Sequence, residues 1–90
     1  MGLRRLLEEC LSFKLEPQIR SVFLANLGLC YGYAHLGMLR ESKRELQICE
    51  QNSVEYQLPM GPIYGWLRHV CERLGEKAES EQYARLARPV

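Results

Sequence analysis

The sequence predicts an all-α protein with about five helices. Apolar residues recur every three or four positions in most of its segments, which is the spacing of an amphipathic helix. No segment alternates apolar and polar residues with the two-residue period of a β-strand. Glycines and prolines stand between the helical segments. A chain of 90 residues has the length of one small domain, which we take as residues 1–90.

The first two helices are expected over residues 3–13 and 19–36. Pro17 ends the first, because the residue before a proline is pushed out of the α region. The second is apolar or small on almost every side, which is typical of a helix buried between neighbours. Gly28 and Gly32 each cost about 1 kcal/mol of helix propensity, so they indicate close packing or a binding surface.

The third helix is expected over residues 39–51, with an apolar stripe opposite a charged face. Residues 52–62 are expected to be irregular, because they contain the breakers Asn52-Ser53 and a stretch with two prolines and a glycine. Two more helices are expected over 63–74 and 76–87, with Gly75 between them.

The composition is that of a soluble globular protein, with 47% apolar and 26% charged residues. A net charge of +1 gives no strong field for nucleic acid or for a membrane surface, so neither is an expected partner. No apolar run is long enough to span a bilayer, and acidic residues interrupt the N-terminal segment where a signal peptide is apolar. We therefore expect a cytoplasmic protein.

The chain has four cysteines, which raise the questions of disulfides and of metal. Because each lies inside an apolar helical pattern, we expect four buried, reduced thiols. A zinc site needs closely spaced ligand pairs, and neither His35 nor His69 stands at metal spacing from a cysteine. No phosphate-binding loop, nucleophile elbow or metalloprotease motif occurs. We expect no enzyme activity, no metal and no cofactor.

The chain contains an internal repeat. Gly2, Gly37 and Gly75 each precede a helical segment, and the last two also follow one. Aligned on these glycines, the segments place apolar or small residues at corresponding positions, such as Ser42 and Ser80. The three glycines are 35 and 38 residues apart. Repeats of about this length indicate stacked helical hairpins, in which each hairpin buries its apolar stripe against its neighbours.

The segments LANLGLCYGYAHLG and ESKRELQIC together resemble a tetratricopeptide repeat, and a looser unit follows in YGWLRHVCERLG and ESEQYARLA. Asn26 departs from the family pattern in the first unit, and Arg68 and Cys71 depart from it in the second. The resemblance implies a right-handed solenoid of antiparallel hairpins: a half-repeat helix at 1–16, one repeat at 20–52 and another at 62–88. The repeat positions carried over are Cys30, Tyr33, Gly37, Ser42, Leu46, Cys49, Leu67, Cys71, Gly75, Ser80, Ala84 and Ala87.

The resemblance also implies a function. Such arrays bind a peptide or a partner helix in a concave groove, so the chain is expected to be a protein–protein interaction module, an adaptor or scaffold. The groove positions carried over are Leu27, Tyr31, Ala34, His35, Trp66, His69 and Arg73. Trp and Tyr are frequent anchors of interfaces, although Trp66 and Tyr31 are equally expected to pack only against the next helix.

Two other functions stay open at this point. The first is a sensor or chaperone domain of a transcriptional regulator or a secretion system. The second is an unrelated small helical bundle, which could bind nucleic acid. Because the sequence begins in mid-repeat, we expect a fragment of a longer array, a chain that needs a partner, or a homo-oligomer or domain swap through the exposed terminal repeats.

Overall fold

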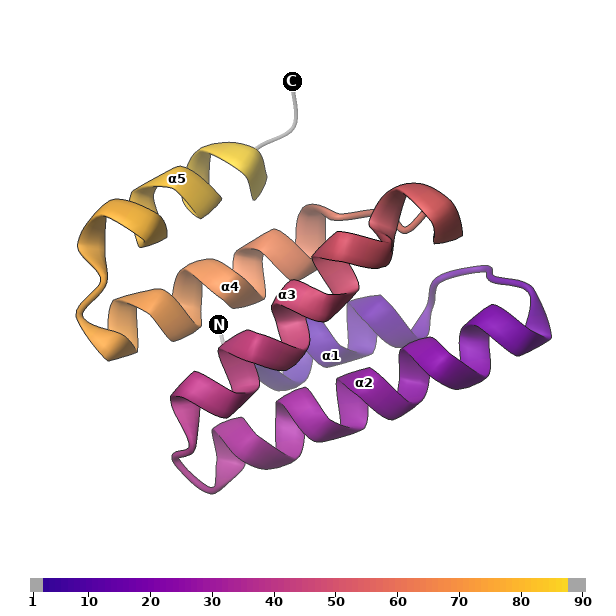
Figure 1. Cartoon of the computed structure of the whole chain (residues 1–90), viewed down its shortest axis with the longest axis horizontal. Helices are drawn as coiled ribbons and strands as arrows, with labels where there is room; N and C mark the ends of the chain where they lie inside the picture. Colours follow the sequence, from indigo (N-terminus) through magenta and orange to yellow (C-terminus); the bar gives the residue numbers. More distant parts are fainter. Residues whose placement is uncertain (1–2, 88–90) are drawn as a thin grey trace.

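The computed structural model describes residues 3–87 of the chain. These residues form five helices joined by short connections, and they contain no strand (Figure 1). The expected all-α class is therefore confirmed. Gly2, named above as a repeat position, lies outside the described residues. The helices are α1 (Leu3–Leu11), α2 (Pro17–His35), α3 (Leu39–Tyr56), α4 (Gly61–Leu74) and α5 (Lys77–Ala87).

Helices α2 and α3 form one hairpin, and α4 and α5 form another with the same turn. Gly37 and Gly75 both have a positive φ, 79° and 78°, which a glycine adopts at little cost. The amide that follows each glycine bonds a carbonyl of the preceding helix: Met38 to Tyr33 at 2.8 Å, and Glu76 to Cys71 at 2.9 Å. The two turns therefore repeat at an interval of 38 residues.

A buried serine repeats at the same interval. The hydroxyl of Ser42 in α3 donates to the carbonyl oxygen of Cys30 in α2 at 2.9 Å. The hydroxyl of Ser80 in α5 donates to the carbonyl oxygen of Arg68 in α4 at 3.3 Å. Each serine is small enough to let the two helices approach and polar enough to tie them together. These positions are two of those predicted from the repeat pattern.

Helix α3 is longer than predicted, because it continues through Asn52 and Ser53 to Tyr56. The Ser53 hydroxyl bonds the carbonyl of Glu50 at 2.7 Å, so the serine is satisfied inside the helix. The helix ends instead at Gln57, which has a left-handed φ of 54°. The amide of Leu58 then caps the carbonyl of Ser53 at 3.0 Å. Residues 52–56 were wrongly predicted to be irregular.

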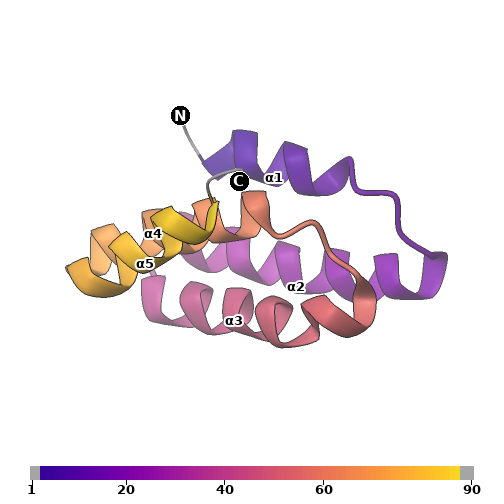
Figure 2. The ribbon, with the colours of Figure 1, turned by 90° about the horizontal axis from the view of Figure 1, so that it is seen from above.

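Helix α1 does not lie where the half-repeat prediction places it. In an open solenoid each helix contacts only its neighbours in the stack. Here α1 packs against α4 more extensively than against α2. It lies on the opposite side of α2 and α4 from α3 (Figure 2). The contacts α1–α2, α2–α3, α3–α4 and α4–α1 close a ring, and α5 packs outside it on α4.

The hydrophobic core fills this ring. Side chains from all four helices of the ring contribute, and those of α4 are the most deeply buried. Tyr83 adds a contact from α5, where its ring stacks on Tyr64 with centroids 6.0 Å apart. The main core residues are Leu6, Cys10, Phe13, Phe23, Leu27, Cys30, Leu46, Cys49, Ile63, Trp66, Leu67, Val70 and Cys71.

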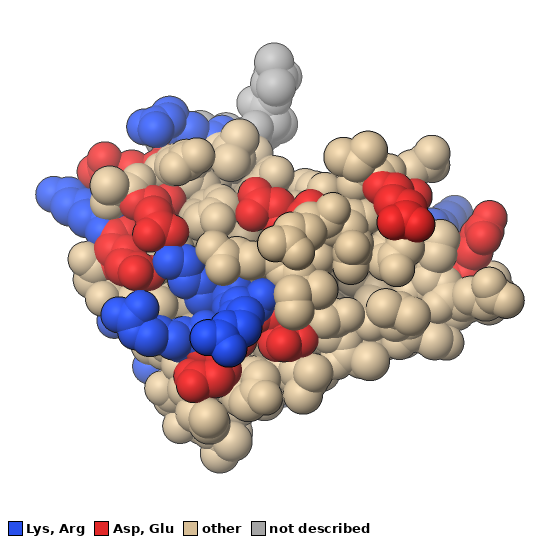
Figure 3. Space-filling view, viewed as in Figure 1, with Lys and Arg blue, Asp and Glu red and all other residues tan. Residues whose placement is uncertain are grey.

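A charged cluster joins the two hairpins. The ammonium of Lys43 in α3 lies 2.7 Å from a carboxylate oxygen of Glu76 and 2.8 Å from one of Glu79. Arg40 adds a longer contact to Glu76, at 3.7 Å. Basic side chains gather over the start of α3 with acidic ones around them (Figure 3). The Lys43 side chain is only 12% exposed, so this pair is better shielded from water than an ordinary surface ion pair.

Candidate partner-binding surface

Three of the predicted groove residues are core residues in this structure. Leu27 and Ala34 of α2 and Trp66 of α4 are all buried, and Trp66 has no exposed surface. The prediction that they line an open groove is therefore wrong for this structure. The contacts of α2 and α4 with the other helices, α1 and α3 among them, bury these three side chains.

The other four predicted groove residues keep some contact with solvent. Tyr31 and His69 are partly buried, while His35 and Arg73 are exposed. The Tyr31 ring meets Trp66 edge-on with centroids 6.4 Å apart, which joins α2 to α4. The His35 ring stacks with Tyr31, with centroids 6.3 Å apart. Burial and then the charge of Arg73 lower the pKa of His69 below its ordinary value.

Helix α1 packs against α2 and α4 with two buried side chains one turn apart, Leu6 and Cys10, and Phe13 is buried just beyond the end of the helix. A Cβ atom at Gly65 of α4 would lie 3.5 Å from Leu6, so the glycine leaves room for the leucine. The Phe13 ring stacks on Phe23 of α2 at 5.4 Å. An apolar stripe on a helix, fitted between two other helices, is the geometry of helix-in-groove recognition.

Among residues 3–87, almost no polar interaction fixes α1 to the other helices. Its two ion pairs are internal to the helix: Arg4 with Glu8 at 3.4 Å, and Arg5 with Glu9 at 3.7 Å. The guanidinium of Arg20 donates to the carbonyl of Phe13, just beyond the helix, at 3.3 Å. With nine residues, α1 is also shorter than the roughly 12–15 residues that an isolated helix needs. Its position therefore depends on apolar contacts.

One buried donor in the core has no acceptor. The indole Nε1 of Trp66 makes no hydrogen bond to any described residue. A buried donor without a partner costs about 1–3 kcal/mol. The Trp66 ring is therefore held by its apolar packing and not by its polar edge.

The four thiols are free and buried, as expected from the sequence. Burial raises the pKa of Cys10 to about 12, with a contribution from the nearby Cys49. A hydrogen bond with Cys49, followed by burial, raises the pKa of Cys30. Neutral thiols are poor nucleophiles, so Cys10 and Cys30 act as small core residues.

Cys71 lies beside the charged cluster that joins the hairpins. Its sulfur and the carboxylates of Glu76 and Glu79 lie within 4.8 Å of one another. The ammonium of Lys43 hydrogen-bonds both carboxylates, and Arg40 adds a second positive charge beside Glu76. Burial alone would lower the pKa of Lys43, but the hydrogen bonds to Glu76 and Glu79 outweigh it and the pKa is raised. This cluster is a structural ion-pair network.

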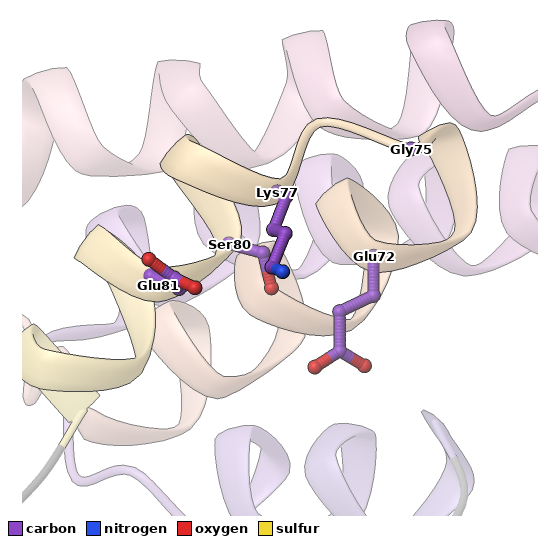
Figure 4. Close-up of a pocket in the computed structure, with 5 residues that line it drawn as sticks. All are labelled: Glu72, Gly75, Lys77, Ser80 and Glu81. Atoms are coloured by element: carbon purple, nitrogen blue, oxygen red, sulfur yellow. The ribbon is translucent and has the colours of Figure 1, made fainter.

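A shallow hollow lies at the turn of the second hairpin, between α4 and α5. The hollow is lined by Glu72, Gly75, Lys77, Ser80 and Glu81, with the Lys77 amine near Ser80 (Figure 4). Glu72 is already paired with Arg68 at 2.7 Å. The charges around the hollow are therefore mixed, and they select no single class of ligand.

Comparison of the chain with protein-family models, with curated proteins and with solved structures gave no match. The resemblance to tetratricopeptide repeats therefore remains a prediction. Within residues 3–87, the helices are all too short or too polar to cross a membrane.

Proposed function

We propose that the chain is a protein–protein interaction module that binds an amphipathic helix on the face of α2 and α4. The observation that carries this proposal is α1 itself. It is a short amphipathic helix that packs there through Leu6 and Cys10, and Phe13 extends the apolar contact just beyond its end. A partner helix with apolar residues at the same spacing would make the same contacts. Tyr31 and Trp66 would contact it through their aromatic rings.

In this proposal α1 competes with the partner. A partner binds only the fraction of molecules whose α1 has left the face, so its apparent affinity falls in proportion to that fraction. Weakening the apolar contacts that hold α1 against α2 and α4 should therefore increase partner binding. The same change would weaken binding if α1 were only a structural support.

A labelled peptide of residues 1–16 tests the proposal, with the full chain as receptor. We expect the Phe13→Ala variant to bind this peptide severalfold more tightly than the unmodified chain does, as measured by fluorescence anisotropy. A peptide with serine at positions 6, 10 and 13 is the matched control and should not bind. Circular dichroism establishes that the variant is folded, and Leu6→Ala serves as a second variant.

The closed ring of α1–α4 is also compatible with the alternative of a small helical bundle in which α1 stays packed on α2 and α4 and no partner replaces it. In that case neither variant would bind the peptide while remaining folded. That result would contradict the proposal.

A further inference from the structure

The outer face of α2 lacks the third neighbour that α4 has. Helix α4 packs mainly against α5, α3 and α1, whereas α2 packs mainly against α3 and α1 and meets α4 through the Tyr31–Trp66 contact. We define the outer face of α2 as the side of the helix turned away from Phe23, Leu27 and Cys30. At 100° per residue it is one continuous stripe. It consists of Ser21, Val22, Ala25, Gly28, Leu29, Gly32 and Leu36.

The repeat shows what this face is built to contact. Moved by the 38-residue interval of the two turns, Ala25, Gly28, Leu29 and Gly32 correspond to Ile63, Trp66, Leu67 and Val70. All four of these α4 residues are 0% exposed, because other helices cover them. On α2 the corresponding face is open: Val22 and Leu29 are 47% exposed, and Leu36 is 73% exposed. A helix is therefore the shape that fits the outer face of α2.

The glycines on this face are not needed by the chain itself. A Cβ atom added to Gly28 or Gly32 would meet nothing within 4 Å. Each glycine nevertheless costs about 1 kcal/mol of helix propensity relative to alanine. With aliphatic side chains on either side of them, the two glycines leave space for another helix to approach closely.

The distribution of charges favours a second copy of α2 as the helix that packs on this face. Residues 21–36 contain no Asp, Glu, Lys or Arg, so two copies of this face meet without repulsion in either direction. A head-to-tail stack, with α5 of one copy on α2 of the next, is disfavoured. In that stack Glu81 takes the place of Lys43, and Glu41 takes the place of Glu79. Two carboxylates would then replace the ion pair that joins the hairpins.

We propose that the outer face of α2 is a homodimer interface, in which α2 of one copy packs against α2 of a second copy. A two-fold axis brings the same residues of both copies together, as in most homodimers. A contact through one helix per copy is small, so the dimer should be weak and concentration-dependent. This inference does not rest on the proposed function, because it uses the opposite face of α2 from the one that α1 covers.

Analytical ultracentrifugation of the full chain over a wide concentration range tests this proposal. We expect a reversible monomer–dimer equilibrium that Leu29→Glu abolishes. The matched control is Leu86→Glu, because Leu86 of α5 is also 47% exposed but lies outside the interface. This control should dimerise like the unmodified chain. A chain that remains monomeric at the highest soluble concentration would overturn the proposal, as would a dimer that survives Leu29→Glu.

Replacing Gly28 and Gly32 by alanine gives a second test, because it should raise the stability of the monomer and weaken the dimer. The double variant should melt at a higher temperature than the unmodified chain, measured where both are monomeric, because alanine favours the helix. It should also dimerise severalfold more weakly, because the methyl groups keep the two helices apart. If it dimerises as tightly as the unmodified chain, the two helices do not meet at these glycines and the proposed packing is wrong.

Discussion

Ser42 and Ser80 hold the two helices of each hairpin together by equivalent hydrogen bonds. The repeat pattern predicts a small residue at both positions, and it predicts the glycine turn that precedes each. The pattern contains no information about the hydroxyl, because alanine would satisfy it equally well. The bonds to the carbonyls of Cys30 and Arg68 are visible only when the partner helix is in place.

The Ser42 bond should contribute measurably to stability. Ser42→Ala removes the hydroxyl from a position with no exposed surface, and we expect a loss of about 1 kcal/mol in the free energy of unfolding. Ser80→Ala should cost less, because its bond is longer and only partly buried. Urea denaturation measures both losses. Ser12→Ala is the control, since that hydroxyl is exposed, and an equal loss there would contradict this explanation.

At the scale of the helices, the sequence predicts where each begins and ends better than what each contacts. Helix α1 illustrates this. Its apolar stripe is plain in the sequence, and the stripe requires a partner surface. The spacing of the apolar residues does not tell where α1 packs. It fits a position beside α2 alone, as the half-repeat predicts, as well as the observed position against both α2 and α4. The choice between them depends on fitting Leu6 over Gly65 and Phe13 on Phe23.

The contact between the hairpins should depend on pH through Glu76. The hydrogen bond from Lys43 lowers the pKa of Glu76 below its ordinary value of 4.5. The carboxylate is therefore more stable as an anion in the folded state. Its contribution to stability is present above pH 4.5 and is lost as the pH falls through the lowered pKa.

The Glu76→Gln variant tests this pH dependence. Other carboxylates also titrate in acid, so the comparison is between slopes. We expect the urea midpoint of the unmodified chain to fall more steeply below pH 4.5 than that of the variant. The matched control is Glu81→Gln, an exposed residue of α5 that lies in none of the ion pairs within residues 3–87. Parallel curves for the unmodified chain and Glu76→Gln would show that the carboxylate is not coupled to folding.

At the scale of the whole molecule, the packing of the ring determines which helix can detach from the others most easily. Helix α4 contacts each of the other four helices and lies at the centre of the core. Helix α1 is short, and its contacts with α2 and α4 are mainly apolar. Local opening draws on the least stable part of a structure. We therefore expect α1 to detach while the two hairpins stay folded.

The cysteines report this opening directly. Cys10 lies in α1, and Cys71 lies in α4 beside Lys43. Both are buried and neutral in the closed form, so each reacts with an alkylating reagent only after it is exposed. We expect Cys10 to be labelled about tenfold faster than Cys71, as followed by site-resolved mass spectrometry under native conditions. Equal rates would mean that α1 separates only when the whole chain unfolds.

The candidate binding face was predictable in part. The resemblance placed Tyr31 and Trp66 in the same groove, and in the structure their rings meet. It could not reveal that Trp66, Leu27 and Ala34 are buried, because their burial depends on how helices far apart in the chain pack together. A repeat pattern describes the contacts between successive helical hairpins. Helix α1 does not pack where a preceding hairpin would, so the pattern does not describe its contacts.

By itself, the sequence determined the five helices, the two glycine turns and the burial of the four thiols. These features depend on local spacing and on backbone preferences that act within a few residues. Only the tertiary structure decided that α1 closes a ring with α2, α3 and α4, and that the outer face of α2 is left open. Those outcomes depend on the fit between surfaces far apart in the chain, which no local pattern encodes.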